Sequence, residues 1–488
     1  MVSLLNLLVV IRVLLSLTFQ VLILRVFGAG LQTDTYYLAL TAVEFLNGLL
    51  LGFILDFYIP VYNDIKARDL EEAKKFSGGV LLFGAGMEII IAIALFIASQ
   101  YIVKIFATGF TEEKIHLSSH LVRIYVFSIP FTGINAILNA TLNANFFMFI
   151  TYLIALFPPL FKIIFLFSFA QKIGIQAIVY SALLSSIFNF LILLFYSRRR
   201  LEWKFQNPFK NREVLFLLKQ SIPTRIAGIL YSLKDPITTN VLSFFPTGYL
   251  TIYKYALRMV GIIFEITNSP ILNVFYVKVS FLYSENKISE LKERLISTIQ
   301  NSSIVFILMV MPFIVGFNEV FSVIFSSKIS GEQLRIMFYI FLLLTLFYWI
   351  LCFETPLIHL TYILKGGLKF LEVGIVFIIL YPLFLWGGIS FMNIYALPTA
   401  LFFSQISTVI MYWNFINKKL HILDNKIFKI AFEFFITLSF FVIINIFFAE
   451  KFFYKLCINA ITMGLWAVLK WGKIIKTFYF LVKEEKIK

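Results

Sequence analysis

The stretch from Arg25 to Pro60 reads RVFGAGLQTDTYYLALTAVEFLNGLLLGFILDFYIP. It joins the end of one apolar segment to a second apolar segment through a turn that contains two glycines, followed by a Thr-Asp pair. The polar residues Asp34 and Asn47 therefore belong to segments that are otherwise apolar. Ionisable side chains at membrane depth are costly and usually face a cavity or a partner. We expect a membrane-embedded helical hairpin whose polar side chains serve function.

The composition of the whole chain points to a lipid environment. Hydrophobic residues make up 60% of the sequence and charged residues 14%, whereas soluble domains carry about 25% charged residues. The formal net charge of +16 fits cytoplasmic loops that collect Lys and Arg in membrane proteins. We therefore expect a protein of the lipid bilayer with no nucleic-acid partner.

Apolar runs long enough to span a bilayer, about 20 residues each, recur about fourteen times. This pattern predicts an all-α integral membrane protein with about 14 transmembrane helices. The runs are 4–27, 36–60, 78–99, 119–143, 147–170, 176–196, 221–245, 250–281, 296–317, 334–364, 370–386, 391–416, 427–448 and 453–482.

Loop charges predict the topology. With a cytoplasmic N-terminus, the loops after even-numbered helices hold eighteen basic residues and those after odd-numbered helices hold seven. The positive-inside rule then places both termini in the cytoplasm. The polar connector SRRRLEWKFQNPFKNRE divides the chain into an N-terminal lobe of helices 1–6 (1–196), a linker (197–213), a C-terminal lobe of helices 7–12 (214–417), and two further helices with a tail (418–488).

An internal repeat supports two lobes. NDIKARDLEEAKKF follows the second helix and SENKISELKERLIS follows the eighth, at an offset of 221, and both predict short amphipathic helices on the cytoplasmic face. GLQTDTYYLAL resembles TGYLTIYKYAL at an offset near 217. Transporters often carry such repeats, with the binding site where the repeats meet.

Basic residues within the apolar runs indicate an anionic guest, because the planar guanidinium of Arg binds two phosphate oxygens at once. The sequence contains no GxSxG motif, no Walker A loop and no cluster of metal ligands. We therefore expect a transporter rather than an enzyme, without a cofactor. The basic candidates for substrate binding are Arg12, Arg25, Arg225, Lys234, Lys254 and Arg258.

A family resemblance rests on RVFGAGLQTDTYYLAL, on YIPVYNDIKARDLEEAKKFSGG and on the later segments NVLSFFPTG and YKYALRM. These segments resemble the MurJ/MviN-type lipid II flippases, which belong to a superfamily of multidrug, oligosaccharide-lipid and polysaccharide exporters. The resemblance implies two pseudo-symmetric six-helix lobes plus two C-terminal helices. It also implies a cationic cavity in which an undecaprenyl-diphosphate-linked sugar is flipped by alternating access.

The resemblance assigns Asp34, Arg12 and Arg258 to substrate binding, and it also shows departures. A second helix 1 Arg of the family falls near Thr18 or Phe19, and its helix 2 Arg falls at Asn47. We predict that Arg225, Lys234 and Lys254 compensate for these missing cations. The family's sodium-binding acid falls near Thr238, with Asp235 about one turn away, which implies a Na⁺ or H⁺ coupling ion at these two residues.

We therefore expect a monomeric flippase of the bacterial cytoplasmic membrane. Its cargo is a polyprenyl-diphosphate-linked saccharide, either lipid II or a related O-antigen or capsule unit. One alternative is a drug or cation antiporter of the same superfamily, which predicts acidic cavity residues such as Asp34, Glu44 and Asp56. The other alternative is a membrane polysaccharide polymerase or ligase, which predicts a large outer loop, and no such loop is present in the sequence.

Overall fold

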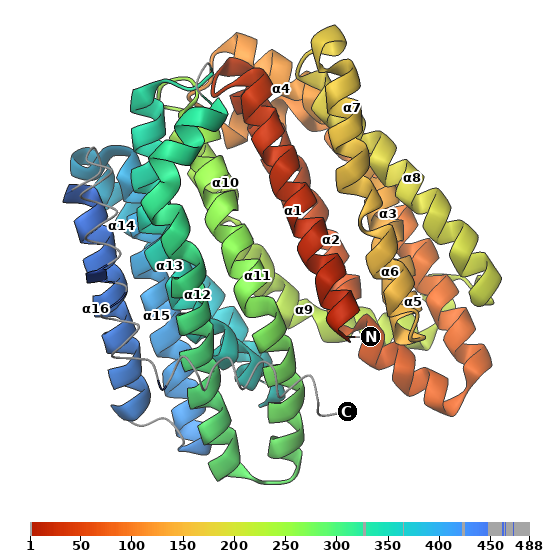
Figure 1. Ribbon diagram of the computed structural model, residues 1–488. Coiled ribbons are helices and arrows are strands. Elements are labelled where there is room, and N and C mark those ends of the chain that lie inside the picture. Colours follow the sequence, from red (N-terminus) through yellow and green to blue (C-terminus); the bar gives the residue numbers. More distant parts are fainter. Residues whose placement is uncertain are drawn as a thin grey trace. The chain divides into compact units, whose positions relative to one another are not determined.

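The computed structural model describes residues 2–325, 328–364, 366–421 and 425–447, together with Ile461, Thr462, Gly464 and Gly472 (Figure 1). All regular elements in this part of the chain are helices. The α-helices are α1 (Val2–Phe27), α2 (Leu31–Arg68), α3 (Leu70–Phe106), α4 (Glu112–Tyr125), α5 (Ile129–Ala144), α6 (Met148–Ile154), α7 (Phe157–Ile173), α8 (Gln176–Arg200), α9 (Arg212–Ser232), α10 (Lys234–Leu242), α11 (Tyr249–Ser284), α12 (Ile288–Phe325), α13 (Gly331–Ile363), α14 (Gly367–Met392), α15 (Ala396–Leu420) and α16 (Asn425–Phe447). Short 3₁₀ helices are η1 (Val126–Ser128), η2 (Pro208–Lys210) and η3 (Asn393–Tyr395).

The helices confirm the prediction of an all-α membrane protein. Thirteen of the fourteen predicted runs coincide with helices, and the run 453–482 lies outside the described residues, apart from the four single positions. Within the described ranges, nine helical stretches are long and apolar enough to cross a membrane, and the longest of them contains both α14 and α15. Many large apolar side chains on these helices are exposed, as expected for surfaces that face lipid.

The internal repeat is confirmed by the helix boundaries. Helix α2 begins at residue 31 and α11 at residue 249, a difference of 218. Helix α3 begins at residue 70 and α12 at residue 288, again 218 apart. The start of α4 at residue 112 and the start of α13 at residue 331 differ by 219, and the ends of α7 and α14 at residues 173 and 392 differ by the same number.

The repeat extends to one tertiary contact. In the first repeat the Asn135 amide of α5 donates to the main-chain oxygen of Ser186 on α8, at 3.1 Å. In the second repeat Gln405 of α15 donates to the carboxylate of Glu354 on α13. Both pairs are 51 residues apart in the chain, and both numbers shift by 219. The two repeats thus join equivalent helices at the same position.

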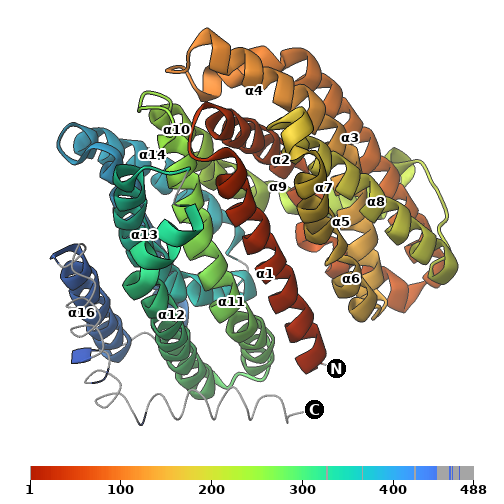
Figure 2. The same cartoon turned by 45° about the horizontal axis from the view of Figure 1, so that its top comes forward.

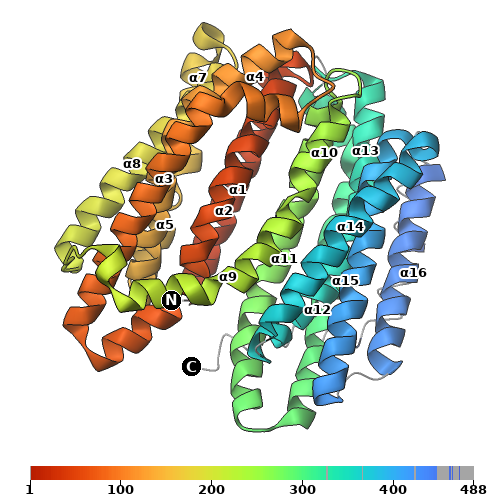
Figure 3. The same ribbon diagram turned by 180° about the vertical axis from the view of Figure 1, so that it is seen from behind.

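Two compact units make up the fold. One is Leu4–Thr251, and the other comprises Ile252–Lys488 with Met1–Ser3. In the first unit α7 and α8 lie side by side (Figure 2), and in the second unit α14 packs along α15 (Figure 3). The units divide at residue 251 rather than in the connector 197–213, so α9 and α10 pack with the first unit; the predicted lobe boundaries at 197–213 and 418 stay a prediction.

The prediction of short amphipathic helices after α2 and α11 is wrong. Helix α2 continues to Arg68, and Asp69 begins α3 directly by accepting hydrogen bonds from the main-chain N–H groups of Glu71 and Glu72, at 2.8 and 3.3 Å. Aspartate is a favoured N-cap because its oxygen satisfies N–H groups that have no partner within the helix. The polar residues are therefore the ends of long helices that meet at a sharp turn.

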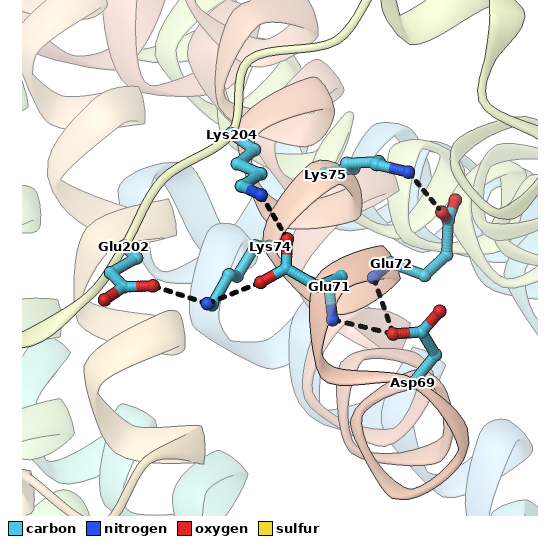
Figure 4. A network of polar contacts seen from close by, with 7 residues as sticks. All are labelled: Asp69, Glu71, Glu72, Lys74, Lys75, Glu202 and Lys204. Atoms are coloured by element: carbon cyan, nitrogen blue, oxygen red, sulfur yellow. Dashed lines mark hydrogen bonds and ion pairs between the residues drawn. The ribbon is translucent and has the colours of Figure 1, made fainter.

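The polar connector after α8 is held against the first turns of α3 (Figure 4). Lys74 of α3 pairs with Glu202 at 2.5 Å, and Lys204 pairs with Glu71. The backbone of the connector passes directly over Gly78, where an added methyl group would lie 2.3 Å from the main-chain oxygen of Lys204. Because only a residue without a side chain allows this approach, the connector has a defined path along α3.

The ion pairs of the connector lower the pKa of Glu71 from 4.5 to about 2 through hydrogen bonds from Lys204 and Lys74. A carboxylate whose pKa falls on folding stabilises the fold at pH values above its unfolded pKa. This contribution is lost only as the pH falls through the folded value of about 2. The ion pairs are solvent-exposed and therefore contribute little to the free energy of unfolding. The close packing of the connector's main chain on Gly78 contributes more to holding the connector against α3.

We predict that Gly78→Ala weakens the attachment of the connector. Its methyl group overlaps the Lys204 carbonyl, and such overpacking typically costs about 1–3 kcal/mol of unfolding free energy. Thermal unfolding of the purified protein in detergent measures this loss. Gly86→Ala is the matched control in the same helix, because nothing lies within 4 Å of its added methyl group. An equal loss in both variants would contradict the close packing at Gly78.

Candidate functional site

The turn between α1 and α2 is built by glycine and threonine. Gly28 adopts a φ of 70°, which glycine tolerates without strain, and its N–H closes α1 on the Leu24 carbonyl. The Thr33 hydroxyl donates to the Gly28 carbonyl and accepts from the N–H of Gly30, each at 2.9 Å. The turn therefore positions the next residue, Asp34, within the first turn of α2.

The Asp34 carboxylate is buried and surrounded by donors from its own chain. It accepts from the N–H of Gly248 at 2.7 Å and from the N–H and hydroxyl of Thr251 at 3.0 and 2.7 Å. The Lys114 ammonium of α4 lies 3.6 Å away and also contacts the ring of Phe110. Asp34 thus connects α2 to the α10–α11 turn and to α4, and its predicted role in substrate binding stays a prediction.

Two other connections meet at the same end of the first unit. Gly109, in the loop after α3, donates to the Ser243 hydroxyl at 2.9 Å, and Asn240 donates to the Ile105 carbonyl at 2.9 Å. The connections after α1, α3 and α10 therefore gather at one end. In the predicted topology all three lie on the outer side of the membrane.

A cation lies beside Asn47, the position at which the family resemblance implies an Arg in helix 2. The Arg225 guanidinium of α9 donates to the main-chain oxygen of Gly48 on α2, directly beside Asn47. Asn47 itself contacts Thr132 of α5 and the carboxylate of Glu88 on α3. Arg225 and Asn47 are therefore neighbours although 178 positions separate them; the predicted compensation stays a prediction.

The second missing position also has a basic neighbour, which the sequence analysis did not identify. Lys162 of α7 places its ammonium 5.8 Å from the ring centre of Phe19 on α1, and its side chain is half-buried. A charged residue inside the apolar run 147–170 was the available signal. Its proximity to Phe19 could not be predicted, because it depends on how α7 packs against α1.

Three predicted residues lie together on α10. The Lys234 ammonium lies 3.7 Å from the ring centre of Tyr231, a geometry typical of cation–π attraction. The Thr238 hydroxyl is buried and donates to the Lys234 carbonyl at 2.6 Å. Asp235 is half-buried in the first turn of the helix. The coupling role of Asp235 and Thr238 stays a prediction.

The remaining basic residues are divided between the units. In the first unit, Arg12 of α1 is half-buried and Arg25 near the end of α1 is exposed. In the second unit, Lys254 and Arg258 are one helical turn apart on α11, with Lys254 half-buried and Arg258 exposed. Each unit therefore carries basic side chains on helices of the membrane region.

Asparagine side chains at the end of α5 bind neighbouring helices. The amide of Asn145 donates to the Tyr62 hydroxyl at 3.0 Å and its oxygen accepts from Lys66 at 2.7 Å. Asn143 accepts from Thr151 at 2.7 Å. These amides join α5 to α2 and α6 and leave the basic side chains as the stronger candidates for binding cargo.

The helix repeat and the long apolar helices define a multi-pass membrane protein built from two similar helical repeats. Two solved structures share this fold: a lipid II flippase MurJ in an inward closed conformation (TM-score 0.77, 18% identity, covering 97% of this chain and 100% of that chain) and an inward-facing multidrug MATE transporter (TM-score 0.72, 14% identity, covering 84% and 94%).

The family model described as "Lipid II flippase MurJ" matches residues 23–465, and the chain belongs to this family. A probable lipid II flippase MurJ from Buchnera aphidicola subsp. Schizaphis graminum is 26% identical over 281 residues, which cover 56% of this chain and 54% of that relative. The chain thus aligns with about half the length of this curated relative. The family resemblance drawn from the Arg25–Pro60 stretch is confirmed.

We predict that Asp34→Ala destabilises the protein strongly. The substitution leaves the buried Lys114 ammonium without its carboxylate, and breaking a buried ion pair on one side typically costs about 3–5 kcal/mol. Thr251→Val is the matched milder variant, because it removes one hydroxyl donor and should cost about 1 kcal/mol. Thermal unfolding in detergent compares them. Equal effects of the two variants would contradict the central position of Asp34.

Proposed function

We propose that the protein flips a polyprenyl-diphosphate-linked saccharide, lipid II or a related unit, outward across the bacterial cytoplasmic membrane. Membership of the lipid II flippase family supports the class of cargo. The observation that carries the proposal for this chain is the Arg225 guanidinium beside Asn47, bound to the Gly48 carbonyl. A guanidinium on a membrane helix is suited to a diphosphate, because it can form paired charge-assisted hydrogen bonds.

The first unit offers a second cation for the same ligand. Lys162 and Arg225 come from different helices, and each lies beside one of the two positions that lack a basic residue, Phe19 and Asn47. In this proposal the diphosphate is bound by these side chains together with Arg12 and Lys234. In this proposal the positive charges that bind the diphosphate come from α7 and α9 instead of from the positions of Phe19 on α1 and Asn47 on α2.

Alternating access is the proposed mechanism, with both termini in the cytoplasm. The hydrogen bonds of Asp34 to Gly248 and Thr251 lie within the first unit and hold the start of α2 to the α10–α11 turn. The membrane potential supplies driving force, because moving an anion outward is favoured by about 2.3 kcal/mol per charge per 100 mV when the inside is negative.

The antiporter alternative depends on acidic residues that bind a cationic drug. Asp34, one of its three candidates, already accepts three hydrogen bonds and lies next to Lys114. Glu44 is exposed, and the side chain of Asp56 lies outside the described residues. The basic residues of the membrane helices favour an anionic cargo over a cationic one.

We predict that Arg225→Glu abolishes flipping, because the new charge repels the diphosphate. The measurement is growth of a bacterial strain depleted of its own lipid II flippase, in which the wild-type chain should restore growth and the variant should not. Lys172→Glu is the matched control, since Lys172 lies exposed in the last turn of α7. Full rescue by Arg225→Glu would overturn its role, and failure of the wild-type chain would point to another saccharide.

We predict that Lys162→Gln lowers the flipping rate at least about tenfold, since a hydrogen bond to a charged group contributes about 1.5–3 kcal/mol. Lys162→Arg should keep most of the activity because it retains the charge. The rate is measured with fluorescent lipid II in proteoliposomes, and equal rates for Lys162→Gln and wild type would exclude Lys162 from the site.

A further inference from the structure

Glu88 is a second buried carboxyl of the first unit, and neither the sequence analysis nor the proposed cargo site uses it. It is the central residue of α3, eighteen positions from Leu70 and from Phe106. At a rise of 1.5 Å per residue it lies about 27 Å from either end of the helix. Its exposed fraction is 1%, so the carboxyl group is covered by protein, and the headgroups at the helix ends are remote from it.

The protein provides a fitted space for this carboxyl. On α5, a methyl group added to Gly133 would lie 2.6 Å from the Glu88 Cγ and 2.9 Å from its Oε1. From α2, a terminal atom of the Asn47 amide lies 2.8 Å from Oε2 and 3.2 Å from Oε1 of Glu88, within hydrogen-bond distance of the carboxyl. The second terminal atom of the Asn47 amide lies 3.3 Å from the hydroxyl oxygen of Thr132 on α5. Three helices therefore enclose the group.

The surrounding helices supply no counter-charge to Glu88. In the described part of the chain, no basic side chain lies within ion-pair distance of its carboxyl oxygens. Arg225 of α9 binds the Gly48 carbonyl, and Arg123 of α4 donates to Ser99, eleven residues further along α3.

Acidic and neutral groups complete the surroundings. On α2, Glu44 is exposed three residues before Asn47, and it interacts electrostatically with Tyr125 of α4. Helix α5 and η1 contain no ionisable residue, and α10 approaches α3 near Ile105 through Asn240. An ionised carboxylate in such an apolar environment is strongly disfavoured without a cation, so the group neutralises instead.

We propose that Glu88 is a membrane-embedded proton-binding site, and that its protonation is coupled to the transport cycle. The carboxylate oxygen takes up one proton to form the neutral acid in the conformation described here, and releases the same proton when helix motion exposes it to water. A proton is favoured over a metal cation, because no group of three or more His, Cys, Asp or Glu side chains that could hold a metal ion is found among the described residues.

Proton exchange agrees with the direction of transport. This part of the inference rests on the proposed function. An inward-moving proton and an outward-moving diphosphate both shift charge in the direction that a negative interior favours. The first unit would then hold an anion site around Arg225 and a proton site at Glu88, connected through the adjacent residues Asn47 and Gly48 of α2.

The first experiment measures protonation without any cargo. Infrared difference spectra of the full-length protein in lipid nanodiscs at neutral pH should show a protonated-carboxyl band that shifts in D₂O and is absent in Glu88→Gln. Glu354→Gln is the matched control, because Glu354 is a buried carboxyl of the second unit that accepts from Thr408 at 2.5 Å; the Glu88 band should remain in this variant. An unchanged spectrum in Glu88→Gln would overturn the proton site.

Gly133→Ala keeps the test informative if Glu88→Gln does not fold. Its methyl group displaces the carboxyl but leaves it titratable, so the band should move to a different frequency. A band that stays in place in Gly133→Ala would contradict its assignment to Glu88.

The second experiment measures coupling. In proteoliposomes containing fluorescent lipid II, an inward-directed proton gradient should raise the wild-type flipping rate at least about fivefold, a typical coupling, and should leave the rate of Glu88→Gln unchanged. An equal response of both proteins would overturn the coupling. If the wild type flips no lipid II while the infrared band still disappears in Glu88→Gln, the proton site stands and the proposed cargo is wrong.

Discussion

Satisfying one buried carboxylate, Asp34, is the constraint on which the first unit depends. The carboxylate needs several donors because water does not reach it. The donors come from the start of α11 and from Lys114 of α4, which are far from residue 34 in sequence. The glycine turn at residue 28 and the Thr33 hydroxyl fix where the carboxylate lies. The turn between α1 and α2 therefore positions a carboxylate that binds the first turns of α4 and α11 to the first turn of α2.

The contact between Asp34 and Thr251 joins the two segments that are similar in the internal repeat. Asp34 and Thr251 stand at the same place in the similar segments GLQTDTYYLAL and TGYLTIYKYAL, 217 residues apart, and they are hydrogen-bonded to each other. This spacing is one residue shorter than the 218 residues between the starts of α2 and α11. At this contact one partner is a carboxylate acceptor and the other a hydroxyl donor, so the two side chains are complementary. The repeat itself is visible in the helix boundaries.

Much of the fold could be predicted from sequence, because apolar runs of membrane length define helices without further information. The polar ends of α2, α3, α11 and α12 misled the prediction, since a charged helix end and a separate amphipathic helix have the same local pattern.

The candidate site was predictable only in part. Arg225 could be recognised as a cation within an apolar run, but its contact with α2 could not, since it joins positions 177 residues apart. Lys162 and Glu88 are likewise charged residues within apolar runs, and their neighbours could not be predicted from the sequence. Sequence shows that such groups are costly in the membrane, and only packing shows which neighbour relieves the cost.

The glycine at residue 78 has a consequence for how this protein can be altered. The main chain at Lys204 packs against Gly78. The longest polar connector in the described chain is therefore held against α3 and is not a flexible linker. A tag or reporter domain inserted there would have to displace a packed main chain. Exposed, polar loops usually tolerate insertions, but the composition of this connector is a misleading guide because its main chain is packed.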